Sequence, residues 1–446
     1  MKKRVFLVAM LQLFMVLGGC SSDSGDNVTP TPEPPVVVIK TPKVLSFSKN
    51  SGESGETISI TGENFSEKVS EIKITFDGVA ATVVSATATE IKVVLPQTEK
   101  VLPKMVVTIG DKEVVNEVKN TYNGNIGILP KPTMNSWFVI ENTKKSTLQI
   151  GRIQIINDQV MYYSISDDNA NEGVYRTLDG GISWSLWANS KYNTGFYATK
   201  KDEGLCYTPV GYQFSGGGVN KIPAGGKTNE KPNTYVWKEI NSGYPGIYSV
   251  YTDDDLQKAT LVSQRGDVYT SSNGADFTQV YDAHLNDQTY ASGFVNKSAE
   301  IDNDHIWVGG QKEISGTKYP FILFRNNQTD GWKEHYLANE PTDFVIEISF
   351  ADTANGFLLN SNNSIYKTTN GGDTWTKVYT GEKFRKFTFK DANTGWATLE
   401  NKIYKTIDGG VTWILDYTHD QPIRGIACKN NIVWAFSTDK IIKRYL

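Results

Sequence analysis

The sequence predicts an all-β protein in which a small β-sandwich precedes a seven-bladed β-propeller. Three observations lead to this fold. The chain of 446 residues is rich in Gly, Tyr, Phe and Trp, as turn-rich β-proteins are. Short runs of alternating apolar residues occupy positions 42–123. A repeat with a period of roughly 40–55 residues fills positions 134–446, which is typical of a propeller.

The first residues predict export from the cytoplasm. Three basic residues precede an apolar run from Val5 to Leu17, which suits a signal peptide and is short for a membrane-spanning helix. The motif LGGC at 17–20, followed by polar residues, resembles the lipobox of bacterial lipoproteins. This resemblance implies removal of residues 1–19 and a diacylglycerol anchor on Cys20. The alternative is an ordinary signal peptide with an incidental cysteine.

The residues after the cysteine predict a surface location. Asp23 and Asp26 resemble the surface-export signals of Bacteroidetes lipoproteins, so we expect a lipid-anchored chain at the outer membrane, on the cell surface. Residues 20–41 are rich in Ser, Asp, Thr and Pro and cannot bury enough apolar surface to fold. We interpret them as a tether between the membrane and the folded part.

Residues 42–123 form the first predicted domain. Their short period-two strands, separated by turn residues, predict a β-sandwich. SGESGETISITGENF at 51–65 and FDGVAATVVSATATEIKVVLP at 76–96 resemble the immunoglobulin-like IPT/TIG family. The resemblance implies a spacer or interaction module without chemistry of its own.

The second predicted domain, at 134–446, carries a recurrent turn signature. Each copy has an Asp or Asn that can cap a turn between two strands, a glycine suited to positive φ, and an aromatic residue. The copies are VYRTLDGGISW at 174–184, VYTSSNGADF at 268–277, IYKTTNGGDTW at 365–375 and IYKTIDGGVTW at 403–413.

The signature resembles the Asp-box. Together with FADTANGF at 350–357 and FKDANTGW at 389–396, the repeat is similar to the propellers of photosystem II assembly factors. The Asp-box resemblance implies a folding role rather than catalysis or metal binding. The structural Asp-box residues are Asp179, Asn273, Asn370, Asp408, Trp184, Trp375 and Trp413.

The number of blades follows from the spacing of the aromatic residues in the repeats. Each interval between them holds four short strands, which make one blade. After Trp413 only three strands remain, whereas SWFVIEN at 136–142 is a strand without partners. We therefore predict that this N-terminal strand completes the last blade and closes a ring of seven, which removes exposed sheet edges. The aromatics counted are Trp184, Trp237, Phe277, Trp332, Trp375 and Trp413.

Composition and spacing exclude several kinds of site. A formal net charge of −4 argues against nucleic acid, which requires a basic face. Cys206 and Cys428 fall in blades that are not adjacent, so we expect no disulfide and two small buried hydrophobes. The four histidines, at 284, 305, 335 and 419, have no ligand spacing, and neither a metal nor another cofactor is expected. All ten tryptophans fit blade-packing positions, so their number does not indicate glycan binding.

Arginine placement suggests a charged site. Arg152, Arg385 and Arg424 lie in or near the first strands of three neighbouring blades, and these strands line the channel of a propeller. Two interpretations stay open: each arginine pairs with a local carboxylate, or the arginines bind an anion at the channel mouth through their guanidinium forks. The arginine patch of the photosystem-type propellers, which the repeat resembles, favours the second.

Loop lengths single out one face of the ring. The connections between second and third strands and between blades share a face, here called the long-loop face, and the chain expands there at 164–173, 211–219 and 309–319. Long loops on a rigid scaffold often bind ligands. The alternative is that their aromatic residues only pin the loops down. The candidate contact residues are Tyr192, Tyr212, Phe214 and Tyr244.

Three functions fit this sequence. The first is a non-catalytic cell-surface lipoprotein that binds a glycan or an acidic polymer on the long-loop face. The second is a protein-assembly or adhesion scaffold. The third is a glycoside hydrolase, because sialidases and some xyloglucan hydrolases have similar Asp-box propellers. The sialidase Arg-Ile-Pro signature is missing, since Gln154 follows Arg152-Ile153, and no catalytic residue is assigned; Asp167 and Asp168 are unmatched carboxylates.

The lipobox hypothesis predicts the behaviour of a Cys20→Ala variant. Without the thiol that accepts the lipid, the protein should leave the membrane fraction or remain unprocessed. Cell fractionation followed by immunoblotting measures both outcomes. A Cys20→Ala protein that is processed and still partitions with membranes would contradict the anchor.

Overall fold

The computed structural model describes most of the chain after the predicted tether. Thr41–Leu446 form one compact unit. The predicted signal peptide, Cys20 and nearly all of the tether lie outside the described residues. No helix in the described part of the chain is long and apolar enough to cross a membrane. The described residues are 40–131, 133–141, 149–166, 173–188, 195–209, 217–226, 247–274, 276–283, 293–327 and 329–446.

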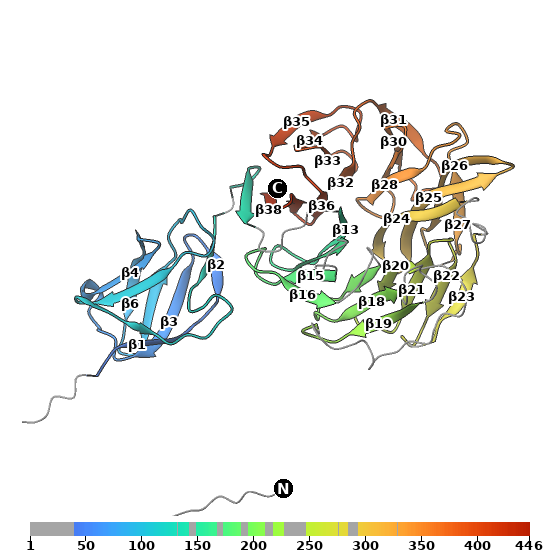
Figure 1. Cartoon of the computed structure of the whole chain (residues 1–446). Coiled ribbons are helices and arrows are strands. Elements are labelled where there is room, and N and C mark those ends of the chain that lie inside the picture. The colour runs from blue at the N-terminus through green and yellow to red at the C-terminus, as the bar shows by residue number, and fades with distance from the viewer. Residues whose placement is uncertain are drawn as a thin grey trace, which may run out of the picture. The chain divides into compact units, whose positions relative to one another are not determined.

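The first folded part is a β-sandwich (Figure 1). One sheet has the strand order β10-β1-β3-β7-β6 and the other β5-β4-β8-β9, while β11 pairs with β2. The elements are β1 (Lys43–Phe47), β2 (Ser51–Glu53), β3 (Thr57–Glu63), the 3-10 helix η1 (Val69–Glu71), β4 (Ile72–Phe76), β5 (Val79–Ala80), β6 (Thr82–Ala86), β7 (Glu90–Val94), β8 (Met105–Ile109), β9 (Lys112–Glu113), β10 (Val115–Asn116) and β11 (Gly127–Leu129).

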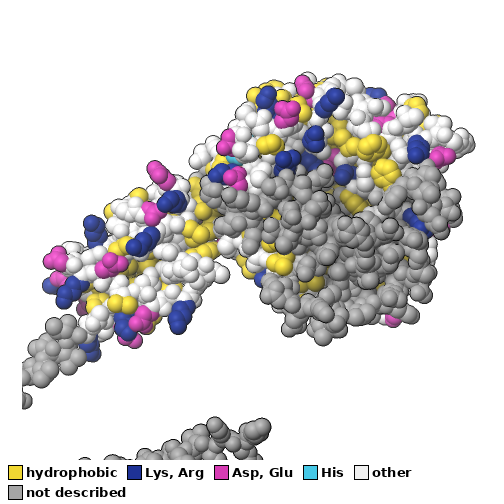
Figure 2. All heavy atoms as spheres, in the orientation of Figure 1, with side chains coloured by type: hydrophobic (Ala, Val, Ile, Leu, Met, Phe, Trp, Pro, Cys, Tyr) yellow, Lys and Arg dark blue, Asp and Glu magenta, His cyan; other side chains and the backbone are white. Residues whose placement is uncertain are grey.

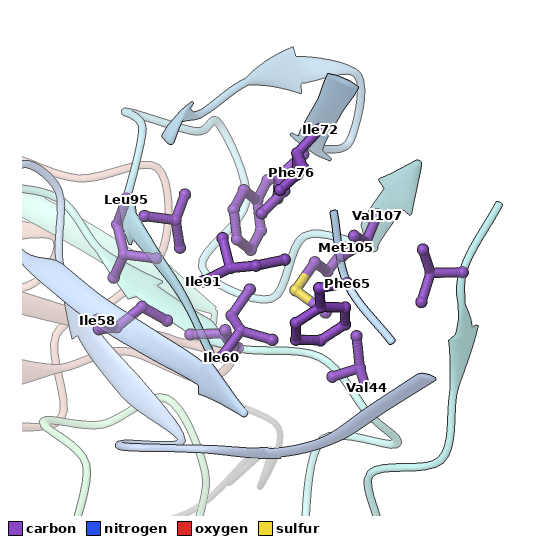
Figure 3. Close-up of a cluster of buried hydrophobic side chains, with 14 of the residues drawn as sticks. Val44, Ile58, Ile60, Phe65, Ile72, Phe76, Ile91, Leu95, Met105 and Val107 are labelled. Atoms are coloured by element: carbon purple, nitrogen blue, oxygen red, sulfur yellow. The ribbon is translucent and has the colours of Figure 1, made fainter. Parts of the chain in front are cut away.

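Alternating residues fill the sandwich core. In β4 the side chains of Ile72, Ile74 and Phe76 are buried, whereas those between them are exposed or half-buried. Buried apolar side chains from both sheets meet in one cluster (Figure 3). Gly62 is required by close packing, because a Cβ there would lie 2.0 Å from the carbonyl oxygen of Lys43. The predicted immunoglobulin-like sandwich is confirmed.

Seven antiparallel sheets, the blades, follow in a ring (Figure 1). Six have four described strands, and the second has three described strands. The blades are, from the innermost strand outward: β13 (Gln149–Ile155), β14 (Met161–Ser166), β15 (Gly173–Thr177), β16 (Ser185–Ala188); β17 (Phe196–Ala198), β18 (Gly204–Pro209), β19 (Gly217–Ile222); β20 (Ile247–Thr252), β21 (Ala259–Ser263), β22 (Val268–Ser271), β23 (Thr278–Tyr281); β24 (Gly293–Asp302), β25 (His305–Ile314), β26 (Thr317–Arg325), β27 (Lys333–Tyr336); β28 (Val345–Phe350), β29 (Gly356–Asn360), β30 (Ser364–Thr368), β31 (Thr376–Thr380); β32 (Lys386–Phe389), β33 (Gly395–Leu399), β34 (Lys402–Thr406), β35 (Ile414–Thr418); β36 (Gly425–Lys429), β37 (Ile432–Phe436), β38 (Lys440–Tyr445), β12 (Trp137–Glu141).

The last blade takes its outer strand from the beginning of the propeller sequence. β12 pairs antiparallel with β38, in a register that runs from Trp137 opposite Arg444 to Glu141 opposite Lys440. The innermost strand of this blade, β36, lies beside β13 of the first blade. The prediction that an N-terminal strand completes the seventh blade is confirmed.

A buried lysine joins the last blade to the first. The Nζ of Lys443, on β38, donates hydrogen bonds to the carbonyl oxygens of Gly180 (3.0 Å) and Asp158 (3.3 Å) in blade 1. It also lies 4.0 Å from the ring centre of Trp434. Burial lowers the pKa of Lys443 to about 7, although the charges of Asp158, Glu53 and Asp179 oppose the shift.

The repeat turns, defined as 177–184, 368–375 and 406–413, join the third and fourth strands of their blades. In the last of them, Oδ1 of Asp408 accepts a hydrogen bond from the amide of Thr412 (2.9 Å), and Oδ2 accepts one from its hydroxyl (2.6 Å). The indole Nε1 of Trp413 donates to the carbonyl of Gly410 (3.1 Å), which has a φ of 87°.

The same pattern recurs with an amide in place of the carboxylate. Oδ1 of Asn370 accepts a hydrogen bond from the amide of Thr374 (3.0 Å), and Trp375 donates to the carbonyl of Gly372 (3.0 Å). These Asp and Asn side chains therefore cap their own turns, as expected from the sequence.

The described tryptophans contribute to packing between blades. Trp187, Trp307, Trp396 and Trp434 are fully buried, and Trp137 donates a hydrogen bond from its Nε1 to Asp416 (2.8 Å). Trp237 lies outside the described residues.

Deletion of 134–142 tests the closure of the ring. Without β12, blade 7 loses its outermost strand and the edge of β38 is exposed. The propeller should therefore melt at a lower temperature or aggregate. Differential scanning calorimetry and light scattering measure this, with a deletion of equal length inside the tether as the control. An unchanged melting temperature would mean that the ring closes in another way.

Substitution of Asp408 tests the role of the repeat turns. Asp408→Ala should lower the free energy of unfolding by about 1–2 kcal/mol, because turn amide and hydroxyl groups lose their acceptor. Asp408→Asn is the matched control, since Asn370 caps the equivalent turn, and it should cost clearly less. Equal losses for both variants in urea titrations would argue against the capping role.

Candidate functional site

The innermost strands of the blades surround a central cavity of about 480 Å³. This volume lies in the range of small-ligand sites. All seven blades contribute to its wall, blade 2 through Gly195 and blade 3 through Tyr248. The cavity is the candidate site because it brings together residues from distant parts of the sequence.

Four charged residues occupy equivalent positions on the innermost strands of their blades. In three blades, a backbone amide closes the turn between the first and second strands. Arg152, Glu347 and Lys386 each lie four residues before that amide. Lys297 occupies the same position as Lys386 by a second criterion. Each lies two residues before the residue that pairs with a buried tryptophan of the second strand, Trp307 in blade 4 and Trp396 in blade 6. Equivalent positions on equivalent strands have the same height in the ring, so these side chains can face one another.

Arg152 reaches across the cavity. It starts on β13 of blade 1 and forms an ion pair with Glu300 on β24 of blade 4. On the way its guanidinium carbon lies 5.7 Å from the ring centre of Phe196 and 5.8 Å from that of Tyr197, both on blade 2, and 5.2 Å from that of Tyr251 on blade 3. The guanidinium is thus held by three aromatic rings and one carboxylate.

A second ion pair joins two neighbouring blades. Nζ of Lys386, on β32, lies 2.9 Å from a carboxylate oxygen of Glu347 on β28, and the Glu347 side chain is 13% exposed. Both carboxylates of the cavity wall are therefore paired with a cation.

The cavity nevertheless carries an excess of positive charge. Lys297, Lys390 and Lys429 also line it, and no carboxylate of the described residues forms an ion pair with them. Five cationic side chains face two carboxylates, an excess of three positive charges in a chain whose formal net charge is −4. The cations are Arg152, Lys297, Lys386, Lys390 and Lys429, and the carboxylates are Glu300 and Glu347.

Burial shifts the titration of the central groups. It raises the pKa of Glu300, against the lowering effect of the Arg152 and Lys429 charges. It also raises the pKa of Tyr197 and that of Tyr251 to about 12, so both phenols are neutral at physiological pH. The pKa of Arg152 is raised, because the Glu300 charge and the two phenols outweigh the cost of burial.

One of the three arginines selected from the sequence lies in the cavity wall. Arg152 lines the cavity, but Arg385 and Arg424 do not. They precede β32 and β36, where their amides bond to the carbonyls of Thr398 and Phe436. Their expected channel-lining position was wrong because adjacent residues on a strand point to opposite sides, and the next residue, such as Lys386, takes the inward position.

Several other candidates cannot be placed. The aromatic residues Tyr192, Tyr212, Phe214 and Tyr244 lie outside the described residues, as do Asp167, Asp168 and His284. The expansion at 309–319 is described, and it is an extended hairpin of β25 and β26 with a turn at Ser315 and Gly316 rather than a long loop.

The cysteines differ in their surroundings. Cys206 and Cys428 form no disulfide within the described part of the chain; Cys206 is buried, whereas Cys428 is half-buried and lines the cavity. Burial raises the pKa of Cys428 to about 12, so it is a neutral thiol at physiological pH. The expectation of a buried hydrophobe is confirmed for Cys206 and was wrong for Cys428. No group of three or more potential metal ligands occurs within the described part of the chain.

The described surface that is visible in Figure 2 carries charges of both signs. Lys and Arg side chains are interspersed there with Asp and Glu.

Sequence reasoning missed the cavity residues Lys297, Glu300, Glu347 and Lys386. Only arginines were selected from the first strands of the blades on the basis of the sequence. The available signal was their shared position in the first strand of successive repeats.

One domain family and several solved structures are similar to parts of this chain. Residues 42–125 match the IPT/TIG domain family, so this domain is present. The structure is similar to YCF48 from Cyanidioschyzon merolae, with 16% identity, a TM-score of 0.49 and coverage of 69% of this chain and 98% of that one. A structure of YCF48 bound to D1 peptide has 12% identity and a TM-score of 0.46, with coverage of 71% and 97%.

An auxiliary nutrient binding protein from Bacteroides thetaiotaomicron is also similar, with 12% identity, a TM-score of 0.34 and coverage of 91% of this chain and 98% of that one. No curated protein matches the sequence.

Proposed function

We propose that this protein is a non-catalytic, lipid-anchored cell-surface protein that binds an acidic ligand, such as an acidic glycan, at the central cavity. The observation that carries the proposal is the excess of three positive charges in a cavity of a net acidic chain. Cations that line one concave site add up to a local positive potential, which attracts anions. The LGGC motif at 17–20 supports the anchor, and the ligand enters from the long-loop face.

A hydrolytic function receives less support from the cavity. Glycoside hydrolysis requires one carboxyl group as an acid and another as a nucleophile or base. Glu300 and Glu347 are each paired with a cation, so neither carboxylate is free to take one of these roles. We therefore assign no catalytic residue.

The second candidate function is an assembly or adhesion scaffold. One observation favours it: four large apolar side chains between positions 407 and 415 are exposed, on the last repeat turn and on β35 of blade 6. Exposed apolar patches often mark protein interfaces. The four residues are Ile407 (67% exposed), Val411 (52%), Ile414 (68%) and Leu415 (49%).

A triple variant tests ligand binding by the cavity. Lys297→Gln, Lys390→Gln and Lys429→Gln together remove three cations that have no ion pair among the described residues, so the fold should persist. Binding of acidic glycans by the mature chain should weaken roughly ten- to a hundredfold, and its dependence on salt should flatten. A glycan array identifies the ligand, and titration calorimetry measures the affinity.

The double variant Arg385→Ala plus Arg424→Ala separates the cavity from the channel mouth. If binding persists in this variant and is lost in the triple lysine variant, the contacts lie in the cavity. The reverse result would assign them to the mouth, as first expected from the sequence. Binding of neutral glycans only, unchanged in both variants, would overturn the proposed function.

A further inference from the structure

Arg152, the most enclosed cation of the cavity, is already occupied by a carboxylate of the protein itself. Its Nη2 donates a hydrogen bond to Oε1 of Glu300, and the two side chains are only 14% and 20% exposed. The residues are separated by 148 positions in the sequence. The contact is therefore made by the ring as a whole rather than by any local turn.

The surroundings of Arg152 form a binding box. Phe196, Tyr197 and Tyr251 lie around the guanidinium within 5.8 Å, and these residues come from blades 2 and 3. The rings hold the guanidinium in place and exclude water on their side, which strengthens its attraction for an anion. The box thus presents an ordered donor, and the group that it holds is a carboxylate.

The contact between Arg152 and Glu300 uses one guanidinium nitrogen only. An arginine fork can hold a carboxylate through two parallel hydrogen bonds. An external carboxylate that approaches the fork in this bidentate manner would make a stronger contact than the one that Glu300 makes. The internal contact is accordingly one that a ligand can replace.

Lys429 is a second cation of the cavity wall that can pair with Glu300. Burial raises the pKa of Glu300, and the charge of Lys429, on β36 in blade 7, acts on Glu300 against that rise, as the charge of Arg152 does. Lys429 lines the same cavity and forms no ion pair with a described carboxylate. Glu300 can therefore turn from Arg152 toward Lys429 without leaving an unpaired buried charge, which is the main cost of breaking such a pair.

We propose that Glu300 is an internal competitor for the central site: it occupies the place at Arg152 that the carboxylate group of a ligand takes, and binding proceeds by exchange. This inference rests on the proposed function and specifies its ligand class as carboxylate-bearing compounds. Uronate-containing glycans have this group and neutral glycans do not.

The test compares two variants that each remove one negative charge from the cavity. Glu300→Gln removes the competitor and keeps a side chain of the same size, while Glu347→Gln is the charge-matched control at the Lys386 pair. The probe is a short oligogalacturonate, titrated calorimetrically into the mature chain at fixed ionic strength. A sulfated dextran fragment serves as an anion without carboxylates.

The expected result is a specific gain. Glu300→Gln should bind oligogalacturonate on the order of tenfold more tightly than the unmodified chain and clearly more tightly than Glu347→Gln. The gain should be smaller for the sulfated probe, and it should disappear when Glu300→Gln is combined with Arg152→Gln. If Glu300→Gln lowers the melting temperature, Glu300→Ser provides the second variant for the same comparison.

The following results would overturn the competitor role of Glu300 or the proposed function. An equal gain for Glu300→Gln and Glu347→Gln, or a gain that survives Arg152→Gln, means that only overall charge matters and overturns the competitor role while leaving the proposed function intact. Weaker binding by Glu300→Gln shows that Glu300 supports the site instead and also overturns it. If no form of the protein binds either probe, the proposed function falls, and this inference falls with it.

Discussion

The pairing of β12 with β38 is the constraint on which the rest of the propeller depends. Five residues from Trp137 to Glu141 complete a sheet whose other strands are the last ones of the chain. Lys443, on β38, then donates to two carbonyl groups of blade 1, so the same strand holds the outer edge of blade 7 and its contact with blade 1. With the last blade held against the first, the innermost strands face a common centre.

That centre explains the charge distribution. The strands of a closed ring must point some of their inner side chains at one another, and here these side chains include five cations and two carboxylates. The ion pairs Arg152–Glu300 and Lys386–Glu347 offset part of the repulsion. The remaining positive charge is kept in a hollow within an acidic chain, where an anionic ligand can neutralise it.

The sequence predicted well those features that depend on residues close together along the chain. The turn at 403–413 could be interpreted because Asp408 bonds to Thr412 and Trp413 bonds to Gly410, all within six residues. Asn370 repeats the pattern. Cys206 and Cys428 lie in blades 2 and 7, in agreement with the separate blades that the repeat predicted for them. Arg385 and Arg424 were misplaced because a shift of one residue on a strand reverses the side.

By itself, the sequence determined the two domains, the number of blades, the capped turns and the strand that closes the ring. These follow from periodicity and from local hydrogen-bonding groups, which the order of residues specifies directly. Only the tertiary structure decided which charges share the cavity. Arg152 and Glu300 are 148 positions apart and meet because blades 1 and 4 lie across the same hollow, and no local pattern records a distance across a ring.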